Sequence, residues 1–286
     1  MDLSIVIVSW KVREKLQANL SALFKSQGGF KFEVIVVDNN SQDGTIEMIE
    51  KNYPEVIIIS NSDNYGFAYA NNQAFLKAQG KFILLLNPDM QVETDTLAKT
   101  LAFARDNSQA TVCGCKLIDQ NGQNIKQVRR FPKLKDQLAI VLKLPHIFPK
   151  INRHYLFLDF DYSKAAKVDS IRGAFFLINT ENYLKISKGQ AVELDERYFV
   201  WFEEVDFCRS VYQMGGEVWY NPQACCLDYV GQSFGQLPRL KAQKYFRDSM
   251  LKYFRKWGKK YEVFILKIAW YLVLFLGQNN LLWKKK

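Results

Sequence analysis

A cluster of acidic side chains beside aromatic residues has the clearest potential for proton transfer in this sequence. Glu203, Glu204 and Asp206 follow the segment Phe199–Phe202, in which three of four residues are aromatic. On a helix, Glu203 and Asp206 share one face and Glu204 points elsewhere. Apolar surroundings and neighbouring negative charges both raise the pKa of a carboxyl group toward that of a general base. The pattern therefore predicts a catalytic carboxylate, although a solvated helix face would also accommodate Glu204.

A second polar group, Asn87-Pro88-Asp89, follows an apolar run. Asn87 and Asp89 are two residues apart, so their side chains point to the same side of an extended strand end. Together with water and diphosphate oxygens, their oxygen atoms suit Mg²⁺ or Mn²⁺. A β-turn formed by Asn-Pro-Asp explains these residues equally well.

Two further polar segments follow apolar runs. Asp38 precedes a turn rich in Asn, Ser and Gly, and an acid there can accept a hydrogen bond from a base or a ribose hydroxyl. We interpret Asp38 as a ligand-binding residue because an ionised group leaving a buried strand needs a partner, whereas Asp43 is better explained as a helix N-cap. Asn64–Asn72 opens a helix, where Gly66 permits close approach of a phosphate, although a plain turn is as common.

Four apolar runs rich in β-branched residues predict strands that would position these groups. They are residues 3–8, 33–37, 56–59 and 81–86, and helical spacing follows each of them at 16–24, from 43, at 67–78 and near 94–106. This alternation predicts an α/β fold with a mostly parallel central sheet flanked by helices, in which ligands bind at the carboxyl ends of the strands.

The alternation is lost from about residue 111. Residues 119–165 show no clear period, and we interpret them as an insertion or a mobile region. Regular signals return at 171–178, and a helix near 203–214 and a short strand at 217–220 follow.

The net charge of +10 is concentrated at the C-terminus. Residues 236–286 carry a net charge of +11, so that residues 1–235 carry −1. This near-neutral body disfavours a nucleic-acid-binding protein, and the 48% apolar composition excludes a disordered chain. We therefore expect a body at 1–235 and a separate basic amphipathic helical tail at 236–286.

The tail contains three tryptophans and the apolar run Val263–Leu276. Fourteen residues are short for a membrane span, which needs about 20. Lysine and arginine at both ends of the run favour a segment lying in a membrane interface, and the alternative is a helix that covers the core of the body.

The five cysteines match neither a zinc site nor a disulfide framework, and Met1-Asp2-Leu3 begins a strand rather than a signal peptide. We expect reduced thiols and a cytoplasmic location at the inner face of the cell membrane.

Eight ordered motifs over about residues 3–258 resemble the family 2 glycosyltransferases of the GT-A type, in particular the bacterial rhamnosyltransferase-like branch that builds surface polysaccharides. They are Ser4–Trp10, Val36–Thr45, Asn64–Asn72, Leu86–Asp89, Arg172–Ala174, Asp195–Phe199, Glu203–Asp206 and Arg247–Ser249.

The resemblance implies a GT-A nucleotide-binding fold and a role for each motif. Asp38 would contact the nucleotide base, and Asp89 would bind Mg²⁺ or Mn²⁺. Glu204 stands where the family usually has a catalytic Asp, with Glu203 and Asp206 beside it, and Asp228 stands where the family often has a metal-binding His. The other implied nucleotide-sugar contacts are Ser9, Trp10, Asn40, Asn64, Gly66, Phe67, Asn71, Asn87, Arg172 and Gly173.

The resemblance further implies an inverting, metal-dependent transfer of rhamnose or another hexose from a dTDP- or UDP-sugar to a glycan or polyprenyl-diphosphate-linked acceptor. Glu204 and Asp228 depart from the family pattern, so a nucleotide-sugar-binding protein with little or no transferase activity is the alternative. A nucleotidyltransferase is disfavoured, because Ser9-Trp10-Lys11 follows the first strand instead of a glycine-rich phosphate loop.

Overall fold

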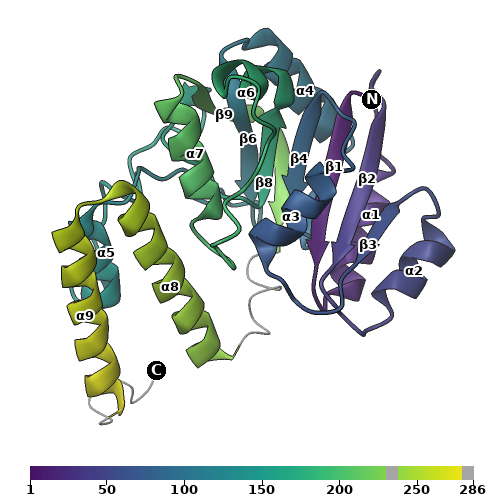
Figure 1. Ribbon diagram of the computed structural model, residues 1–286. Helices are drawn as coiled ribbons and strands as arrows, with labels where there is room; N and C mark the ends of the chain where they lie inside the picture. Colours follow the sequence, from purple (N-terminus) through teal and green to yellow (C-terminus); the bar gives the residue numbers. More distant parts are fainter. Residues whose placement is uncertain (230–237, 279–286) are drawn as a thin grey trace.

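The computed structural model describes residues 1–229 and 238–278. It contains a sheet with helices on both faces and, at one end of that sheet, a group of helices that includes the C-terminal part of the chain (Figure 1). The predicted α/β fold is confirmed.

The described residues form a nine-stranded sheet with the order β3-β2-β1-β4-β8-β6-β9-β5, and β7 pairs with β9. The strands are β1 (Leu3–Ser9), β2 (Phe32–Asp38), β3 (Ile57–Ser60), β4 (Phe82–Leu86), β5 (Met90–Val92), β6 (Ala110–Ile118), β7 (Ala166–Lys167), β8 (Phe175–Asn179) and β9 (Glu217–Asp228). β1 to β4 are parallel, and β8 is antiparallel to both β4 and β6. Since β6 is parallel to β9, six strands run in one direction and their carboxyl ends lie at one edge.

Helices cover both faces because the side chains of each central strand alternate between them. The helices are α1 (Arg13–Leu23), α2 (Thr45–Asn52), α3 (Phe67–Phe75), α4 (Thr96–Asp106), α5 (Leu134–Val141), α6 (Thr180–Ile186), α7 (Glu203–Gln213), α8 (Arg239–Trp257), α9 (Lys260–Gln278) and the 3₁₀ helix η1 (Leu144–His146). Ile5 and Ile7 of β1 pack in one core with α1, α2 and α4. Val6 packs in the other core with α3, α6 and α7.

The structure contains a central strand that the sequence pattern did not reveal. β6 begins where the strand–helix alternation was interpreted as ending, yet it lies between β8 and β9 and is largely buried. Its small residues weaken the strand signal, and Gly114 lies against Ile171, since a Cβ there would be 2.6 Å from Cδ1 of that side chain. Cys113 and Cys115 in this strand form no disulfide, and burial raises the pKa of the Cys113 thiol to about 12.

The stretch 119–165, interpreted as an insertion or a mobile region, contains α5 and η1. α5 packs against α9, more than a hundred residues later in the chain. That contact buries the apolar side of a short helix and is not visible in the local pattern.

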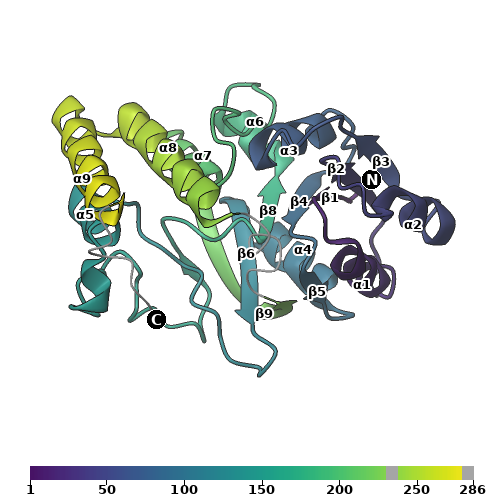
Figure 2. The same cartoon turned by 90° about the horizontal axis from the view of Figure 1, so that it is seen from below.

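The predicted C-terminal helices pack against the body. α5, α8 and α9 lie side by side next to the start of α7 in both views (Figures 1 and 2). Their shared core consists of Val141, Tyr198, Phe202, Val205, Met250, Leu251, Tyr253, Phe254, Leu266, Ala269, Trp270 and Val273. The inner side of α9 therefore covers the core, as in the alternative interpretation of the tail. Within residues 1–229 and 238–278, no helix has the length and apolar content needed to cross a membrane.

Candidate functional site

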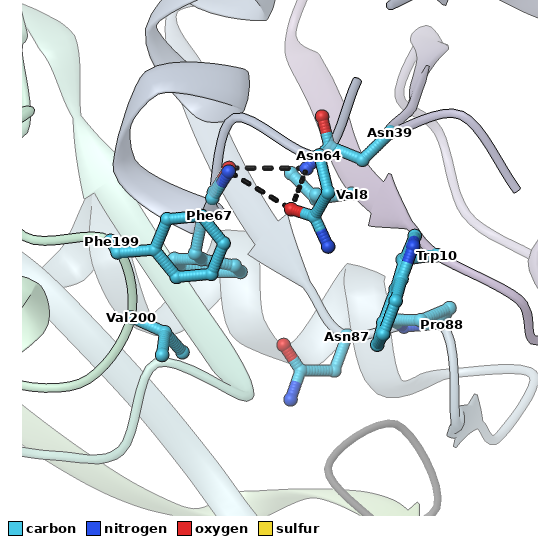
Figure 3. Close-up of a pocket in the computed structure, with 10 residues that line it drawn as sticks. Val8, Trp10, Asn39, Asn64, Phe67, Asn87, Pro88, Phe199 and Val200 are labelled. Atoms are coloured by element: carbon cyan, nitrogen blue, oxygen red, sulfur yellow. Dashed lines mark hydrogen bonds between the residues drawn. The ribbon is translucent and has the colours of Figure 1, made fainter. Parts of the chain in front are cut away.

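A cleft opens at the carboxyl ends of β1, β2 and β4, where several of the predicted motifs converge (Figure 3). Figure 3 shows Trp10 on one side, Phe67 and Phe199 on the other, and Asn87 between them. The lining residues are Val8, Trp10, Asn39, Asn64, Gly66, Phe67, Asn87, Pro88, Phe199 and Val200. Facing aromatic walls can hold a planar base or the apolar face of a sugar.

An asparagine network forms the upper wall of this cleft. The Asn39 amide donates to Oδ1 of Asn64 at 3.3 Å and to the carbonyl of Gly66 at 3.2 Å, and its own Oδ1 accepts from Asn61 at 2.8 Å. Asn39 was not among the predicted contacts, although it lies between Asp38 and Asn40. The three amides fix the loop that begins α3.

Gly66 allows two chain segments to approach each other closely. Its φ is +88°, and a Cβ at this position would lie 2.4 Å from the carbonyl oxygen of Phe199. The same oxygen accepts a hydrogen bond from the backbone N–H of Phe67 at 2.7 Å. The glycine therefore joins the start of α3 to the aromatic segment that precedes α7, and both line the cleft.

Asp38 is buried at the end of β2, and its two carboxylate oxygens accept from the backbone N–H and the hydroxyl of Ser41. A carboxylate has about four acceptor positions, so further bonds to a ligand remain available. Asp38 and Asn40 line a hollow beside Gly44 and Ser60. This hollow is distinct from the aromatic cleft, although Asn39 joins the two.

Ser9 and Asn71 are buried and do not line the cleft. The hydroxyl of Ser9 has no hydrogen-bond partner among the described residues, and its neighbour Trp10 forms a wall of the cleft. The Asn71 amide donates to the carbonyl of Phe67 at 2.8 Å within α3. The Asn71 bond therefore supports the turn of α3 that carries the cleft residue Phe67.

Glu203 and Glu204 form the first turn of α7, and burial raises the pKa of each carboxyl group. The charge of Glu204 raises the pKa of Glu203 further, whereas Arg172 lowers that of Glu204. Oε2 of each glutamate lacks a hydrogen-bond partner within residues 1–229 and 238–278. Both therefore have the raised proton affinity that general-base catalysis requires.

The backbone immediately before these glutamates is strained. Trp201 and Phe202 have φ values of +65° and +72°, in the left-handed region that bulky residues rarely adopt. Phe202 is held in this conformation by packing against Phe246 and Tyr253 of α8. Strain that is maintained by packing is frequent at functional sites, and here it orients the first turn of α7.

Glu204 lies against the predicted motif Arg172-Gly173. A Cβ added to Gly173 would be 3.4 Å from Cβ of Glu204, a van der Waals contact, so the glutamate lies directly against this backbone. The next residue, Ala174, accepts a hydrogen bond from the backbone N–H of Asn87 at 2.9 Å. The Asn87–Asp89 motif and Glu204 thus flank the same backbone segment.

The two predicted metal ligands lie on neighbouring strands. Asp89 directly precedes β5, whose residue Met90 is opposite Asp228 in β9. The Tyr229 N–H donates to the carbonyl of Asp89 at 3.3 Å, and both carboxylates are buried. Asp228 also forms an ion pair with Arg172 at 3.0 Å. The part of the chain that is described contains no group of three or more His, Cys, Asp or Glu residues suited to a metal ion.

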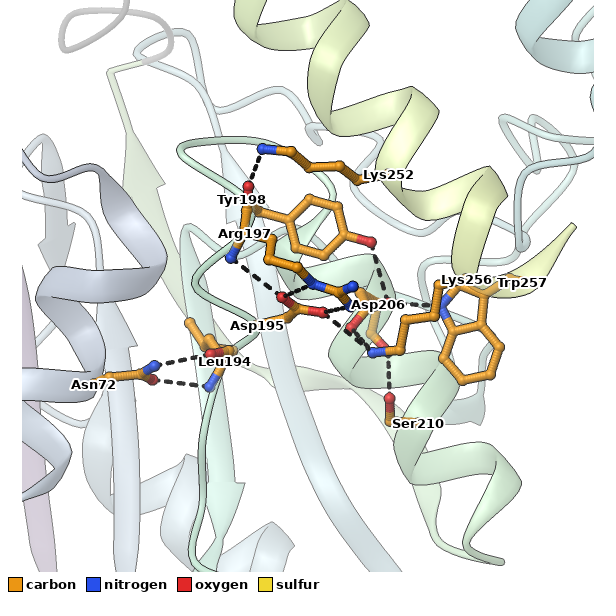
Figure 4. Close-up of polar contacts among 10 residues, drawn as sticks. All are labelled: Asn72, Leu194, Asp195, Arg197, Tyr198, Asp206, Ser210, Lys252, Lys256 and Trp257. Carbon is orange, nitrogen blue, oxygen red and sulfur yellow. Dashed lines mark hydrogen bonds and ion pairs between the residues drawn. The ribbon is translucent and has the colours of Figure 1, made fainter. Parts of the chain in front are cut away.

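Asp206 has contacts unlike those of the two glutamates (Figure 4). Its carboxylate accepts from Nζ of Lys256 at 2.6 Å, Nε1 of Trp257 at 2.6 Å and the hydroxyl of Tyr198 at 3.2 Å. Nζ of Lys256 lies 3.6 Å from Asp195. These bonds fasten α7 to α8 and neutralise the Asp206 charge.

Sequence reasoning missed two groups near Glu204. Burial lowers the pKa of Arg129, and the charges of Tyr155, Arg172 and Glu204 also influence it. Burial disfavours the charged form of both side chains, so for Tyr155 the pKa is raised instead, to about 12. Both lie in the stretch 119–165, where the sequence offered no signal beyond an isolated pair of arginines.

The model of the family "Glycosyl transferase family 2" matches residues 4–166, more than half of the chain. YfnE of Bacillus subtilis, an uncharacterized glycosyltransferase, is 30% identical over 172 residues, which are 59% of this chain and 42% of YfnE. The rhamnosyltransferase WbbL of Escherichia coli is 24% identical over 79% of this chain and 83% of its own length. The N-acetylglucosaminyl-diphospho-decaprenol L-rhamnosyltransferase of Mycobacterium tuberculosis is 23% identical over 72% of this chain and 69% of its own length.

Solved glycosyltransferase structures share the GT-A fold of this chain. The mannosyltransferase PcManGT from Pyrobaculum calidifontis, in complex with GDP-Man and Mn²⁺, has a TM-score of 0.59 at 18% identity, with 94% of this chain and 69% of that chain covered. TarS of Staphylococcus aureus in complex with UDP-GlcNAc has a TM-score of 0.54 at 17% identity, with 96% and 72% covered. The matched family model, the ordered motifs and the shared fold together show that this chain belongs to glycosyltransferase family 2.

Proposed function

We propose that this chain is an inverting glycosyltransferase that moves a hexose from a nucleotide-diphosphate sugar to an acceptor hydroxyl. The observation that carries this proposal is a continuous set of contacts. Glu204 packs on Gly173, the adjacent Arg172 pairs with Asp228, and the neighbour of Asp228, Tyr229, donates its backbone N–H to the carbonyl of Asp89. A base candidate, a cation and two carboxylates therefore lie along one edge of the sheet.

The donor would lie in the cleft between Trp10 and Phe199, with its nucleotide directed toward Asp38. The asparagine network offers amide groups to the donor, and Arg172 offers a positive charge to its diphosphate. The complexes of PcManGT with GDP-Man and of TarS with UDP-GlcNAc support this class of donor. We expect a dTDP- or UDP-sugar, because rhamnosyltransferases are among the relatives.

Asp89 and Asp228 fit a divalent cation that takes its other ligands from the donor. They are two buried hard oxygen ligands, one in β9 and one directly before its partner strand β5, and Mg²⁺ is commonly bound through one or two carboxylates plus substrate phosphates. Mg²⁺ or Mn²⁺ there would supply positive charge to the leaving diphosphate. The Mn²⁺ in the PcManGT complex supports this expectation.

Glu204 would act as the general base. As the acceptor oxygen bonds to the anomeric carbon, the bond from that carbon to the diphosphate breaks and the acceptor proton passes to Glu204. Attack from the face opposite the leaving group inverts the configuration at the anomeric carbon. Charge on the departing diphosphate would be balanced in part by Arg172.

We further propose a lipid-linked glycan acceptor at the inner face of the cell membrane. The decaprenol-linked acceptor in the name of the Mycobacterium tuberculosis relative supports this class. The segment 236–286 would provide the membrane contact, because the outer side of α9 exposes large apolar side chains.

Turnover of a panel of nucleotide sugars with Mn²⁺, with and without chelator, tests this proposal directly. We expect release of nucleoside diphosphate from one donor, lost on chelation and reduced at least 100-fold by Asp89→Ala. Unchanged turnover in Asp89→Ala would remove this residue from the metal site. Donor binding without turnover, with any acceptor offered, would instead favour a nucleotide-sugar-binding protein, the alternative raised by Glu in place of the family's usual Asp.

A further inference from the structure

A further cavity, of about 770 Å³, lies outside the candidate active site. It is formed by α7, α8, the start of α9 and the segment that leads into α5. The lining residues are Arg130, Phe131, Pro132, Lys133, Leu134, Lys135, His154, Asp169, Arg209, Tyr253, Phe254, Trp257, Gly258, Tyr261 and Glu262. Four side chains are permanently cationic and two are acidic, so the cavity carries a net positive charge.

The two carboxylates of this cavity already accept hydrogen bonds from the backbone. Asp169 accepts from the N–H of Phe131 at 3.0 Å, and Glu262 accepts from the N–H of Lys259 at 2.7 Å. Within residues 1–229 and 238–278, neither acid forms an ion pair with a cation of the cavity. The positive charge of the cavity is therefore not neutralised by its own acids through ion pairs.

Arg209 is held by aromatic rings at the inner wall of the cavity. Its guanidinium carbon lies 5.0 Å from the ring centre of Trp257 and 5.6 Å from those of Phe131 and Tyr253. Nη1 donates to the hydroxyl of Tyr253 at 2.9 Å. A guanidinium fixed in this way, with other donors remaining, is pre-organised to bind the oxygens of a phosphate.

An exposed apolar stripe on α9 begins at the cavity. Tyr261 lines the cavity and is 54% exposed, and residues at helical spacing continue its face along the helix. These residues are Phe264, Ile265, Ile268 and Leu272. Lys260 and Lys267 flank the stripe and are exposed. A cationic cavity followed by an apolar stripe matches a phosphate group attached to a lipid chain.

We propose that this cavity binds the phosphate of a membrane lipid, while the α9 stripe contacts the acyl or prenyl chain. The inference deepens the proposed membrane contact of residues 236–286 and rests on it. Arg209 follows Glu204 by five positions on α7, an axial rise of roughly 7.5 Å. The two residues are about 140° apart around the helix, so the cavity and the proposed base lie on different sides of α7.

Sedimentation of the full chain with vesicles tests the proposal. The vesicles are phosphatidylcholine alone, and phosphatidylcholine with 30% phosphatidylglycerol.

The charge variant is Lys133→Gln/Lys135→Gln, and its matched control, Lys51→Gln/Lys77→Gln, removes two exposed lysines elsewhere. The stripe variant is Phe264→Ser/Ile268→Ser, and Leu76→Ser, at an 87% exposed leucine outside the stripe, is its control. Arg209→Gln tests the inner wall, with circular dichroism to verify folding.

We expect binding to the anionic vesicles to weaken about 30-fold in the lysine pair at the cavity, from about 1 kcal/mol for each cation near the surface. The control pair should remain within threefold of the wild type. The stripe variant should lose binding to both kinds of vesicle, unlike Leu76→Ser. Millimolar inorganic phosphate at constant ionic strength should compete with vesicle binding in the wild type and not in Arg209→Gln.

Equal losses in the two lysine pairs would show diffuse surface attraction and overturn the cavity as the site. If the chain bound inorganic phosphate but neither kind of vesicle, the ligand of the cavity would be free phosphate and not the phosphate of a lipid. Release of nucleoside diphosphate from a soluble donor is measured separately in all variants. Vesicle binding by a chain without turnover would contradict the transferase proposal and leave the lipid site intact, so the two failures are distinguishable.

Discussion

Three acidic residues within four positions of one another have different environments in the folded chain. Glu203 is buried, and its pKa is raised by burial and by the neighbouring glutamate. The Asp206 carboxylate accepts hydrogen bonds from Lys256, Trp257 and Tyr198. Glu204 lies against Gly173, near the positive charge of Arg172. We therefore propose Glu204, rather than Glu203 or Asp206, as the general base.

Replacing Glu204 with Gln should reduce sugar transfer by about 10²–10⁴-fold, the contribution typical of a general base. Donor affinity should remain near that of the wild type, because the amide preserves the shape of the side chain. Initial rates and calorimetric donor titrations measure the two quantities. Glu203→Gln is the matched control, and loss of transfer in that variant instead would assign the base to Glu203.

The buried Glu203 should make stability dependent on pH. The pKa of Glu203 in the folded chain lies above its ordinary value of 4.5, which applies in the unfolded chain. At a pH between these two pKa values, the folded chain binds more protons than the unfolded chain. The free energy of unfolding therefore falls as pH rises through this window, by about 1.4 kcal/mol for each unit of pKa difference. Glu203→Gln should raise the melting temperature at pH 7, with a gain that shrinks toward pH 4.5. An equal gain in melting temperature at pH 7 and pH 4.5 would show that the ionisation of Glu203 does not cause the effect.

At the scale of elements, the site depends on three segments that meet at the start of α7. The loop before α3 binds the backbone at Phe199, α8 holds Phe202, and the segment Arg172–Gly173 packs on Glu204. The first turn of α7 is therefore positioned by its neighbours as much as by its own hydrogen bonds.

Replacing Gly66 with Ala should separate α3 from this segment. The substituted Cβ would lie 2.4 Å from the Phe199 oxygen, and φ is +88°. We expect a loss of stability of about 2–4 kcal/mol and weaker donor binding, measured by denaturant unfolding and donor titration. Gly122→Ala is the control, since Gly122 has a φ of +75° with open space around it. Equal losses of stability in Gly66→Ala and Gly122→Ala would show that the positive φ alone causes the loss, with no contribution from the contact with Phe199.

Replacing Lys256 with Met should weaken the junction of α7 and α8. The buried carboxylate of Asp206 would keep its bonds to Trp257 and Tyr198, so we expect a loss of about 1–3 kcal/mol, below that of a fully broken buried pair. Thermal unfolding measures the change. Lys252→Met is the control, because the Lys252 ammonium donates to the carbonyl of Arg197 rather than to a carboxylate. If Asp206→Asn removed the effect of Lys256→Met, the pairing would be supported, and additive losses would contradict it.

At the scale of the whole molecule, the C-terminal helices extend the core and expose a second surface. Met250, Tyr253 and Phe254 of α8 share a buried cluster with Phe202 and Val205. The described part of the tail expected at 236–286 forms α8 and α9, and α8 is packed against the proposed catalytic helix.

A chain ending at residue 235 should therefore be less stable than the full chain. Removal of α8 would expose the cluster around Phe202, and each large apolar side chain transferred to water costs about 1.5–3 kcal/mol. We expect a lower melting temperature and increased binding of a hydrophobic dye. A chain ending at residue 258 retains α8 and should lose less. An unchanged melting temperature in the shorter chain would establish residues 1–235 as an independent domain.

Strand positions were predictable because each is encoded in a few consecutive residues. The runs at 3–8, 33–37 and 81–86 coincide closely with β1, β2 and β4, and their polar ends include several residues of the cleft. β6 was missed because its small residues pack between two strands from distant parts of the sequence. Asn39 and Tyr155 were missed because their roles arise from neighbours that no local pattern reveals.

The amino-acid pattern was enough to predict the α/β alternation, the carboxyl-edge location of the polar motifs and the excess of charge at the C-terminus. Each of these depends on local periodicity or composition. The tertiary structure alone decided that Asp206 pairs with Lys256, that Arg172 pairs with Asp228 and that Gly66 accommodates Phe199. These contacts join segments 50, 56 and 133 residues apart, and only folding can bring such segments within hydrogen-bond distance.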